Sequence, residues 1–473
     1  MNVPIVRLFG VVMVLFALLV GFTSRWTVFE AEALRAESAN QPRQALAEER
    51  IRRGRIRSAD GRVLAASRRL PGERYARRYP TGSLFAHPVG YSFTTEGRSG
   101  LERFYNEALV GRTNDLVGVV DSLLGERAVG DDLETTLSAR AQQVAMDALG
   151  DRRGAVVAMD VRTGAVRVMA STPTYDPAAV GEVGTGDLNR ATGSPLINRA
   201  TQGVYPPGST FKVVTAAAAL DSGDYTPDTV VDGSNGKPIS GVPLQNFGGR
   251  DWGAIDLRTA LTQSVNTVWA EVGVELGRET MTEYMERFGF YEDPPLDYPD
   301  EQMVPSGVRK GDRRRLVRPG SARVDVGRMA IGQGDLEASA LQMATVAQTV
   351  GNGGARMKPY LVDKVVDPDG RTVFETEPEE VEQVISEDAA AQLTAMMRDV
   401  VREGTGTAAA LAGVEVAGKT GTAELNATDL NQPWFIGFTP EVAVAVTVEA
   451  QQGGTGGTVA APIAKAVLEA LGQ

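Results

Sequence analysis

The sequence predicts an α+β protein that is held to a membrane by its N-terminus. An uninterrupted apolar run of 15 residues, Leu8 to Phe22, lies close to the start of the chain. Runs of β-branched residues follow at 154–171 and again at 414–450, and a long segment rich in helix formers separates them. Strands contributed by both ends of one domain, with helices between and after them, are typical of an α+β layout around one sheet.

The apolar run is long enough to cross a bilayer. Val3 to Trp26 contains 24 residues if Arg7 is included, because its long side chain can reach the lipid surface. A membrane-spanning helix needs roughly 20 residues, and Trp26 has the position of an interfacial aromatic. A cleaved signal peptide is the alternative, but no small-x-small site directly follows Phe22. Residues 1–26 are therefore predicted to be an uncleaved anchor. The charges on its two sides do not determine its orientation in the membrane.

Short elements are predicted between the anchor and residue 150. Thr27 to Arg53 is rich in Ala, Glu and Arg and is expected to be helical, with an interruption near Pro42. Arg53 to Ser67 predicts a short strand pair around a turn at Asp60-Gly61. A helix is expected from Ser138 to Leu149.

The rest of the chain carries the strands and helices of the predicted sheet. GAVVAMDV, which begins at Gly154, and AVRVMAS, which ends at Ser171, predict a hairpin around Arg162-Thr163-Gly164. Residues 209–410 are expected to be mostly helical, with long polar loops. Strands return in VEVAGKTGTAE, WFIGF and VAVAVTVEA, and a helix from Ala461 to Leu471 follows them.

Composition restricts the chemistry of any active site. The chain has no cysteine, which excludes thiol nucleophiles, disulfides and thiolate-bound metals. His87 is the only histidine, so a Ser-His-Asp triad would have to use it, and no polyhistidine metal site can form. We expect no metal and no cofactor. The net charge of -12 argues against nucleic-acid binding, and the basic clusters Arg50 to Arg57 and Lys310 to Arg323 are interpreted as solvated faces.

The first motif, Ser209-Thr210-Phe211-Lys212, follows two prolines and a glycine and precedes an apolar helical run. Lysine occurs only 7 times against 41 arginines, and lysine, unlike arginine, can lose its proton when it is desolvated. Ser209 is expected to begin a helix, which brings residue i+3 to the same face. Lys212 could then act as a base if its pKa fell from about 10.4 toward 7. An isolated S-x-x-K is more often a plain helix cap, and Ser234 to Lys237 matches the pattern in a predicted loop.

Two further motifs are weak when each is taken alone. Ser264-Val265-Asn266 lies in a helical stretch, where small polar residues usually pack or cap. Lys419-Thr420-Gly421-Thr422 lies on a strand-like run. Gly413 to Thr420 also matches the phosphate-binding pattern G-x-x-x-x-G-K-[ST]. A phosphate loop needs a strand before its first glycine and a helix from its lysine, and this sequence shows neither, so we reject that interpretation.

Taken together, the three motifs resemble those of the penicillin-binding proteins and serine β-lactamases. The first positions are separated by 55 and 155 residues, as in larger members of that family. Supporting segments are NRATQGVYPPGSTFK, AIGQG (Ala330 to Gly334) and AGKTGTAE. Upstream, RGRIRSADGRVLA and GRSGLERFYNEALVG are similar to the pedestal motifs of class B enzymes, although Ser58-Ala59-Asp60 replaces the usual Asp-Arg-Asn. The resemblance is strongest to the penicillin-binding protein A type of actinobacteria.

The resemblance implies a fold and a reaction. The expected domains are an anchor (1–26), a small β-rich pedestal or dimerisation-type domain (27–150) and a penicillin-binding transpeptidase domain (151–473) with a mainly antiparallel sheet flanked by helices. The expected activity is that of a peptidoglycan D,D-transpeptidase. Such an enzyme cross-links stem peptides through a serine acyl-enzyme, releases D-alanine, and is acylated by β-lactams.

The resemblance also implies residue roles. Ser209 would be the nucleophile and Lys212 its base, and Ser264 would relay a proton to the leaving D-alanine. Asn266 would hold both the peptide and Lys212, and Lys419 would keep the site electropositive. Thr420, Gly421 and Thr422 would form the substrate-binding segment, with the two threonines on the terminal carboxylate and the N–H groups of Ser209 and Thr422 as the oxyanion hole.

Location and partners follow from the same resemblance. The protein is expected in the cell membrane as a single-pass protein with an extracytoplasmic catalytic domain. Its implied partners are peptidoglycan stem peptides and a polytopic glycan polymerase of the shape, elongation and division type. A β-lactamase or carboxypeptidase, which passes the acyl group to water, is one rival. A β-lactam sensor or inactive scaffold is another, and the sequence does not separate elongation, division and sporulation roles.

Overall fold

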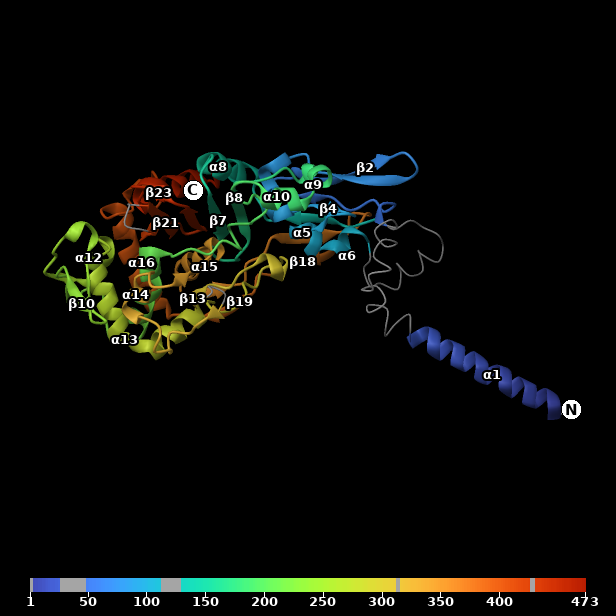
Figure 1. Cartoon of the computed structure of the whole chain (residues 1–473), viewed down its shortest axis with the longest axis horizontal. Coiled ribbons are helices and arrows are strands. Elements are labelled where there is room, and N and C mark those ends of the chain that lie inside the picture. The colour runs from blue at the N-terminus through green and yellow to red at the C-terminus, as the bar shows by residue number, and fades with distance from the viewer. Residues whose placement is uncertain (1–2, 26–47, 112–128, 312–314, 426–429) are drawn as a thin grey trace.

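The predicted membrane helix is the first element of the computed structural model, which describes residues 3–25, 48–111, 129–311, 315–425 and 430–473 (Figure 1). Helix α1 (Val3–Ser24) has 22 residues, so it is about 33 Å long and can span a bilayer. None of its 21-residue candidate span is buried in the rest of the protein. The helix expected from Thr27 lies almost wholly outside the described residues.

One antiparallel sheet organises the larger domain, in the strand order β20-β21-β22-β7-β8 with β23 paired to β21. The predicted hairpin is present as its last two strands, and the sheet is built from both ends of the domain as expected. Alternate residues point to opposite faces, so that Val156 and Ala158 belong to one hydrophobic core and Val157 and Met159 to the other. The strands are β7 (Gly154–Asp160), β8 (Val166–Thr172), β20 (Ala417–Glu424), β21 (Leu430–Phe438), β22 (Val442–Val448) and β23 (Gln451–Gln452).

Helices cover both faces of this sheet. The helices α8 and α17 pack on one face, and Ser138 caps α8 because its side chain accepts a hydrogen bond from Ala141 N. On the other face lie α11, α15 and α16, which contribute to the main core. The helices are α8 (Ala139–Leu149), α9 (Pro177–Val183), α10 (Thr185–Arg190), α11 (Lys212–Asp221), α12 (Leu257–Thr262), α13 (Asn266–Arg287), α14 (Val326–Ala330), α15 (Ala340–Gly351), α16 (Glu387–Arg402) and α17 (Ala461–Ala470).

The segment 209–410 contains more strands than the sequence predicted. Most are two to four residues long, too short for their periodicity to stand out. They are β9 (Val230–Asp232), β10 (Lys237–Ile239), β11 (Val242–Leu244), β12 (Ala254–Asp256), β13 (Gly307–Lys310), β14 (Arg315–Leu316), β15 (Leu336–Glu337), β16 (Ala355–Met357), β17 (Val362–Val366), β18 (Thr372–Glu375) and β19 (Glu380–Gln383).

A second sheet forms the pedestal, in the order β18-β17-β6-β1-β2-β3. The predicted strand pair is present, because Ile56 pairs with Ala65 in the antiparallel β1–β2 ladder. Two strands of the sheet, β17 and β18, come from the segment expected to be mostly helical, far along the chain. The pedestal elements are β1 (Ile56–Arg57), β2 (Val63–Leu70), β3 (Arg74–Arg78), α4 (Ala86–Val89), β4 (Ser92–Phe93), β5 (Gly97–Arg98), α5 (Gly100–Phe104), α6 (Asn106–Leu109) and β6 (Asp132–Thr135).

The turn that departs from the family pattern is closed by its own side chains. The Ser58 hydroxyl accepts a hydrogen bond from Arg62 N at 3.0 Å and donates one to Asp60. Asp60 in turn accepts a hydrogen bond from Ala139 N, at the start of α8, at 3.3 Å. Ser58 and Asp60 therefore tie the pedestal turn to the larger domain.

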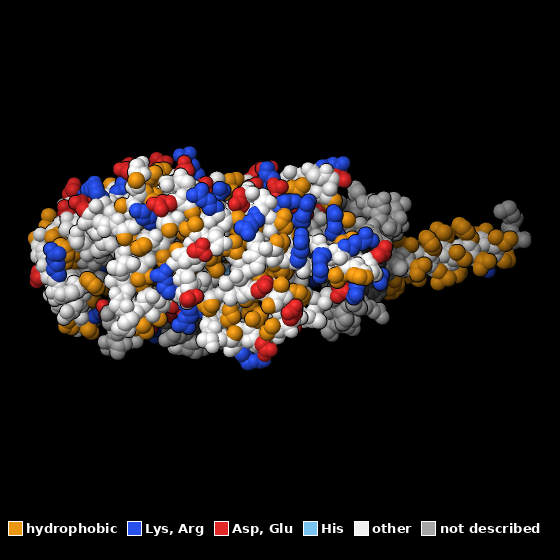
Figure 2. Space-filling model, turned by 90° about the horizontal axis from the view of Figure 1, so that it is seen from above, with side chains coloured by type: hydrophobic (Ala, Val, Ile, Leu, Met, Phe, Trp, Pro, Cys, Tyr) orange, Lys and Arg blue, Asp and Glu red, His pale blue; other side chains and the backbone are white. Residues whose placement is uncertain are grey.

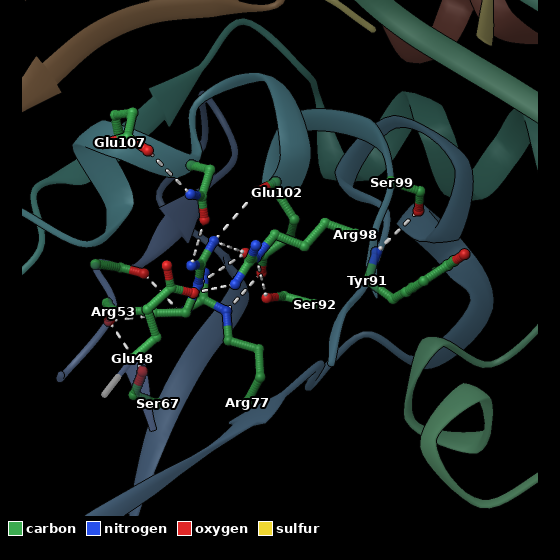
Figure 3. A network of polar contacts seen from close by, with 12 residues as sticks. Glu48, Arg53, Ser67, Arg77, Tyr91, Ser92, Arg98, Ser99, Glu102 and Glu107 are labelled. Carbon is green, nitrogen blue, oxygen red and sulfur yellow. Dashed lines mark hydrogen bonds and ion pairs between the residues drawn. The ribbon is translucent and has the colours of Figure 1, made fainter. Parts of the chain in front are cut away.

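The pedestal core contains a buried ion network (Figure 3). Glu102 is fully buried and pairs with Arg53 at 2.9 Å and with Arg77 at 2.5 Å. Burial by itself would raise the pKa of the Glu102 carboxyl, but the two guanidinium groups hold it below its ordinary value. The interpretation of Arg50 to Arg57 as a solvated face is therefore wrong for Arg53, because tertiary structure supplies a buried partner from a distant helix.

Candidate active site

The turn that carries Ser209 differs from the expected helix start. Residues Gly208–Phe211 form a 3₁₀ turn, η3, and α11 begins only at Lys212. Ser209 lies inside this turn and caps nothing. Gly208 has a φ of +53°, which glycine adopts readily, and the two prolines before it have no N–H to donate. The backbone thus leaves the Ser209 side chain uncommitted to capping.

Glycines in the other motifs allow the Ser209 turn to pack closely. Gly208 N donates to Gly332 O at 3.0 Å, and a Cβ built on Gly332 would lie 1.9 Å from Gly208 O. A Cβ on Gly421 would lie 2.6 Å from Pro207 O. Gly332 of AIGQG and Gly421 of the third motif are therefore required by contact with the backbone of this turn.

The Lys212 amine is buried and points at the second motif. Its Nζ lies 2.8 Å from Ser264 O, 3.2 Å from Ser264 Oγ and 2.7 Å from Asn266 Oδ1. Burial, together with the charge of Lys419, lowers the pKa of Lys212 well below its ordinary value. The expected contact with Ser209 is not formed, because within the described residues the Ser209 hydroxyl makes no hydrogen bond.

Ser264 connects the two lysines. Lys419 Nζ donates to Ser264 Oγ at 2.9 Å and to Thr420 O at 3.0 Å. Burial lowers the pKa of Lys419 to about 7, and burial together with the charge of Lys419 lowers the pKa of Lys212 well below its ordinary value. A neutral Lys212 has a lone pair that can accept the Ser264 proton while Lys419 donates to the same oxygen.

The backbone of Ser264 is unusual. Its φ is +57°, the left-handed conformation that disfavours side chains, and it lies where α12 ends and α13 is about to begin. Val265 N donates to Ala260 O at 2.9 Å, which closes the end of α12 in the manner of a glycine C-cap. Ser194 and Ser240 also have a positive φ, so what distinguishes Ser264 is that its hydroxyl contacts both lysines.

Strand β20 presents the third motif to the cleft. Thr420 Oγ1 lies 2.6 Å from Thr405 Oγ1, and Thr422 Oγ1 accepts a hydrogen bond from Gly456 N at 3.2 Å. Lys419 lies inside the strand and no helix begins at it, so the phosphate-loop interpretation is excluded as predicted. Gly421 permits the close approach of the Ser209 turn.

A cleft of about 1020 Å³ joins these motifs. Its walls include Ser209, Ser264, Asn266, Thr420 and Thr422, which come from segments more than 200 residues apart. The sequence did not single out further residues of the wall, because they are isolated side chains, most of them in loops, without a recurring pattern. They include Gln245, Asn246, Phe247, Arg328, Gln333, Thr405 and Glu424.

Comparison with protein families identifies the chain. A sequence model of the penicillin binding protein transpeptidase domain matches residues 154–469, which is more than half of the chain. The chain belongs to the penicillin-binding protein family. A second model, the penicillin binding protein A dimerisation domain, matches residues 53–133. The predicted family, and its A type, are thereby confirmed.

Individual family members are similar over the whole length. The peptidoglycan D,D-transpeptidase PbpA of Mycolicibacterium smegmatis is 36% identical over 505 residues, covering 99% of both chains. PbpA of Mycobacterium tuberculosis is 35% identical, covering 100% of this chain and 99% of that protein. A structure of penicillin-binding protein A from M. tuberculosis as a ceftriaxone acyl-enzyme superimposes with a TM-score of 0.81 at 32% identity, covering 90% of this chain and 100% of that chain.

Proposed function

We propose that this chain is a peptidoglycan D,D-transpeptidase that forms an acyl-enzyme at Ser209. The observation that carries the proposal is the chain of hydrogen bonds from Lys419 through Ser264 to Lys212. Ser209 lines the same cleft as Ser264, and within the described residues its hydroxyl makes no hydrogen bond. Burial lowers the pKa of both lysines, and the charge of Lys419 lowers that of Lys212 as well, which favours a neutral amine at Lys212. A serine nucleophile requires an adjacent base of this kind.

During acylation, one proton passes from Ser209 to the leaving nitrogen through Lys212 and Ser264. Ser209 Oγ forms a bond to the carbonyl carbon of the penultimate D-alanine, and its proton passes to Lys212 Nζ. The peptide C–N bond then breaks, and the proton reaches the leaving nitrogen of the terminal D-alanine through Ser264 Oγ. The N–H groups of Ser209 and Thr422 stabilise the oxyanion. An amine of a neighbouring stem reverses these steps, so that a new amide forms and the Ser209 hydroxyl is regenerated.

The donor peptide lies along β20 as an added strand, gaining main-chain hydrogen bonds. Its terminal carboxylate binds Thr420 and Thr422, near the Lys419 charge. Gly421 keeps the strand close to Ser209, and Asn266 holds the peptide. A β-lactam enters by the same route because its amide resembles the donor.

We assign the three predicted units to three tasks. Residues 1–26 anchor the chain in the cell membrane, and 151–473 contain the catalytic site. Residues 27–150 form the pedestal with the added strands β17 and β18, except that α8 packs on the catalytic sheet. The catalytic domain faces the extracytoplasmic side, where peptidoglycan is assembled. A polytopic glycan polymerase is the partner that we propose for the anchor and pedestal.

Labelling with a fluorescent penicillin tests the nucleophile. The parent protein should carry one label that survives denaturation, and Ser209→Ala should carry none. Ser234→Ala is the matched control, because Ser234-Asn235-Gly236-Lys237 repeats the S-x-x-K pattern in a loop. Labelling of Ser209→Ala, or loss of labelling in Ser234→Ala, would overturn the assignment. Rapid release of the label as hydrolysed penicillin would favour the β-lactamase alternative.

A further inference from the structure

Charge is distributed very unevenly along the chain. Residues 50–78, which contain β1, β2 and β3, carry 11 arginines and two acidic residues, a net charge of +9. The whole chain carries -12, so all other residues together carry -21. A separation of this size is typical of proteins that bind a charged surface with one end.

Only part of this positive charge is neutralised within the fold. Arg53 and Arg77 pair with Glu102, Arg55 pairs with Asp132, and Arg74 lies 3.8 Å from Glu49. Seven other arginines have no ion pair within the described residues. These seven, which we call the pedestal arginines, are Arg50, Arg52, Arg57, Arg62, Arg68, Arg69 and Arg78.

Six of the seven pedestal arginines are exposed, and Arg57 is partly exposed. Arg68 and Arg78 share one face of the β2–β3 hairpin, because Arg68 pairs with Ala76 and Ala66 with Arg78. Basic side chains gather at the end of the molecule next to the apolar helix α1 (Figure 2). Helix α12 and strand β10 lie at the other end from β2 (Figure 1), and the segments that follow them, 243–249 and 263–266, contribute to the wall of the cleft.

The chain itself keeps this surface near a membrane. Arg25 ends the described N-terminal segment and Glu48 begins the next, so 22 residues separate the two. Whatever their conformation, 22 residues reach at most about 75 Å. The pedestal is thus tethered at high effective concentration to the bilayer that holds α1.

We propose that the pedestal arginines bind the anionic headgroups of the membrane in which α1 is anchored. Each arginine near an anionic surface shifts the equilibrium between contact and release by about fivefold. The strongly acidic remainder is repelled by the same surface. The two effects together hold the pedestal against the lipid and the catalytic cleft away from it, toward the glycan. The inference concerns the pedestal and does not depend on the chemistry at Ser209.

Arginines on β3 could have a second role, which the experiment must distinguish from lipid binding. β3 is an edge strand, and charged side chains on an edge prevent strands of other molecules from adding to it. That role predicts no response to lipid charge. If the pedestal arginines instead bind a protein partner, a sample that contains only the chain and lipid should also show no response to lipid charge.

The test uses the full-length chain in lipid nanodiscs. Because the chain has no cysteine, Pro71→Cys at the exposed hairpin tip provides a single site for a donor dye. The lipids are phosphatidylcholine alone, or phosphatidylcholine with about one third phosphatidylglycerol, and carry an acceptor dye on a headgroup. We expect higher energy transfer with the anionic lipid at ~0.1 M salt, and loss of that difference at ~1 M, where charges are screened beyond about 3 Å.

Two quadruple variants identify the residues responsible. Changing Arg62, Arg68, Arg69 and Arg78 together to Gln should remove most of the response to anionic lipid. The matched control changes Arg140, Arg162, Arg315 and Arg323 to Gln, exposed positions that have no ion pair within the described residues. Penicillin labelling of both variants reports whether they are folded. No response in the parent, an unchanged response in the first variant, or an equal loss in the control would overturn the proposal.

Discussion

Replacing Ser264 separates its hydroxyl from its backbone. Ser264→Ala removes the hydroxyl and keeps a side chain at a φ of +57°. Ser264→Gly removes the hydroxyl and also releases the backbone strain, which is about 1–2 kcal/mol for a side chain in the left-handed region. Both variants therefore lose the same hydrogen bonds to Lys212 and Lys419. They differ in how readily residue 264 adopts a positive φ and in the greater freedom of glycine in the unfolded chain.

The expected magnitudes follow from these contacts. The glycine variant should be more stable than the alanine variant by about 1 kcal/mol, which corresponds to roughly 1–2 °C in Tm for a domain of this size. Both variants should form the acyl-enzyme about 10²–10⁴-fold more slowly, the usual contribution of a positioned proton-transfer group.

Two measurements decide the matter. Thermal unfolding compares the stabilities, and stopped-flow acylation by a fluorescent penicillin gives the second-order rate constant. If both variants acylate at the parent rate, Ser264 is not on the proton path. If the alanine variant is the more stable, the argument from the left-handed backbone is wrong. Ser222→Ala is a control that should leave acylation unchanged, because Ser222 is an exposed serine after α11 that hydrogen bonds to Ala219 O.

Three further predictions follow from the geometry. Lys419→Met removes the charge that helps to lower the pKa of Lys212, so the acid limb of the acylation pH profile should move to higher pH; an unmoved limb would contradict the coupling. Glu102→Gln leaves two buried arginines poorly compensated and should cost about 3–5 kcal/mol in chemical unfolding. Folding lowers the pKa of Glu102, so the ionised carboxylate stabilises the fold at pH values above its unfolded pKa, near 4.5. This stabilisation is lost as the pH falls through the pKa of the folded state. The difference in the free energy of unfolding between parent and variant should therefore shrink in acid. Gly332→Ala should abolish penicillin labelling, because its Cβ would lie 1.9 Å from the carbonyl oxygen of Gly208. The control is Gly370→Ala, also at positive φ but with no atom within 4 Å of the added Cβ. It should lose only about 1 kcal/mol in the free energy of unfolding and keep its labelling.

Periodicity predicted the elements that are long enough to show it. The hairpin of β7 and β8, the closing strands and the helix that follows Ser138 were all expected from local pattern. The short strands between 230 and 383 were not, because two to four residues carry too little periodicity. Strands β17 and β18 join the pedestal sheet only because β6 offers them an edge.

The sequence by itself determined the chemistry that is available: no thiol, one histidine, and a lysine at i+3 from a serine. The spacing of two between Thr420 and Thr422 also puts both on one side of a strand, but the structure decided that this side faces the cleft. Only the tertiary structure decided that Lys212 contacts Ser264 and Asn266 rather than Ser209, and that Lys419 reaches the same hydroxyl from a distant strand. The physical reason is that pKa values and hydrogen bonds depend on burial and on neighbours brought together by folding, and local sequence specifies neither.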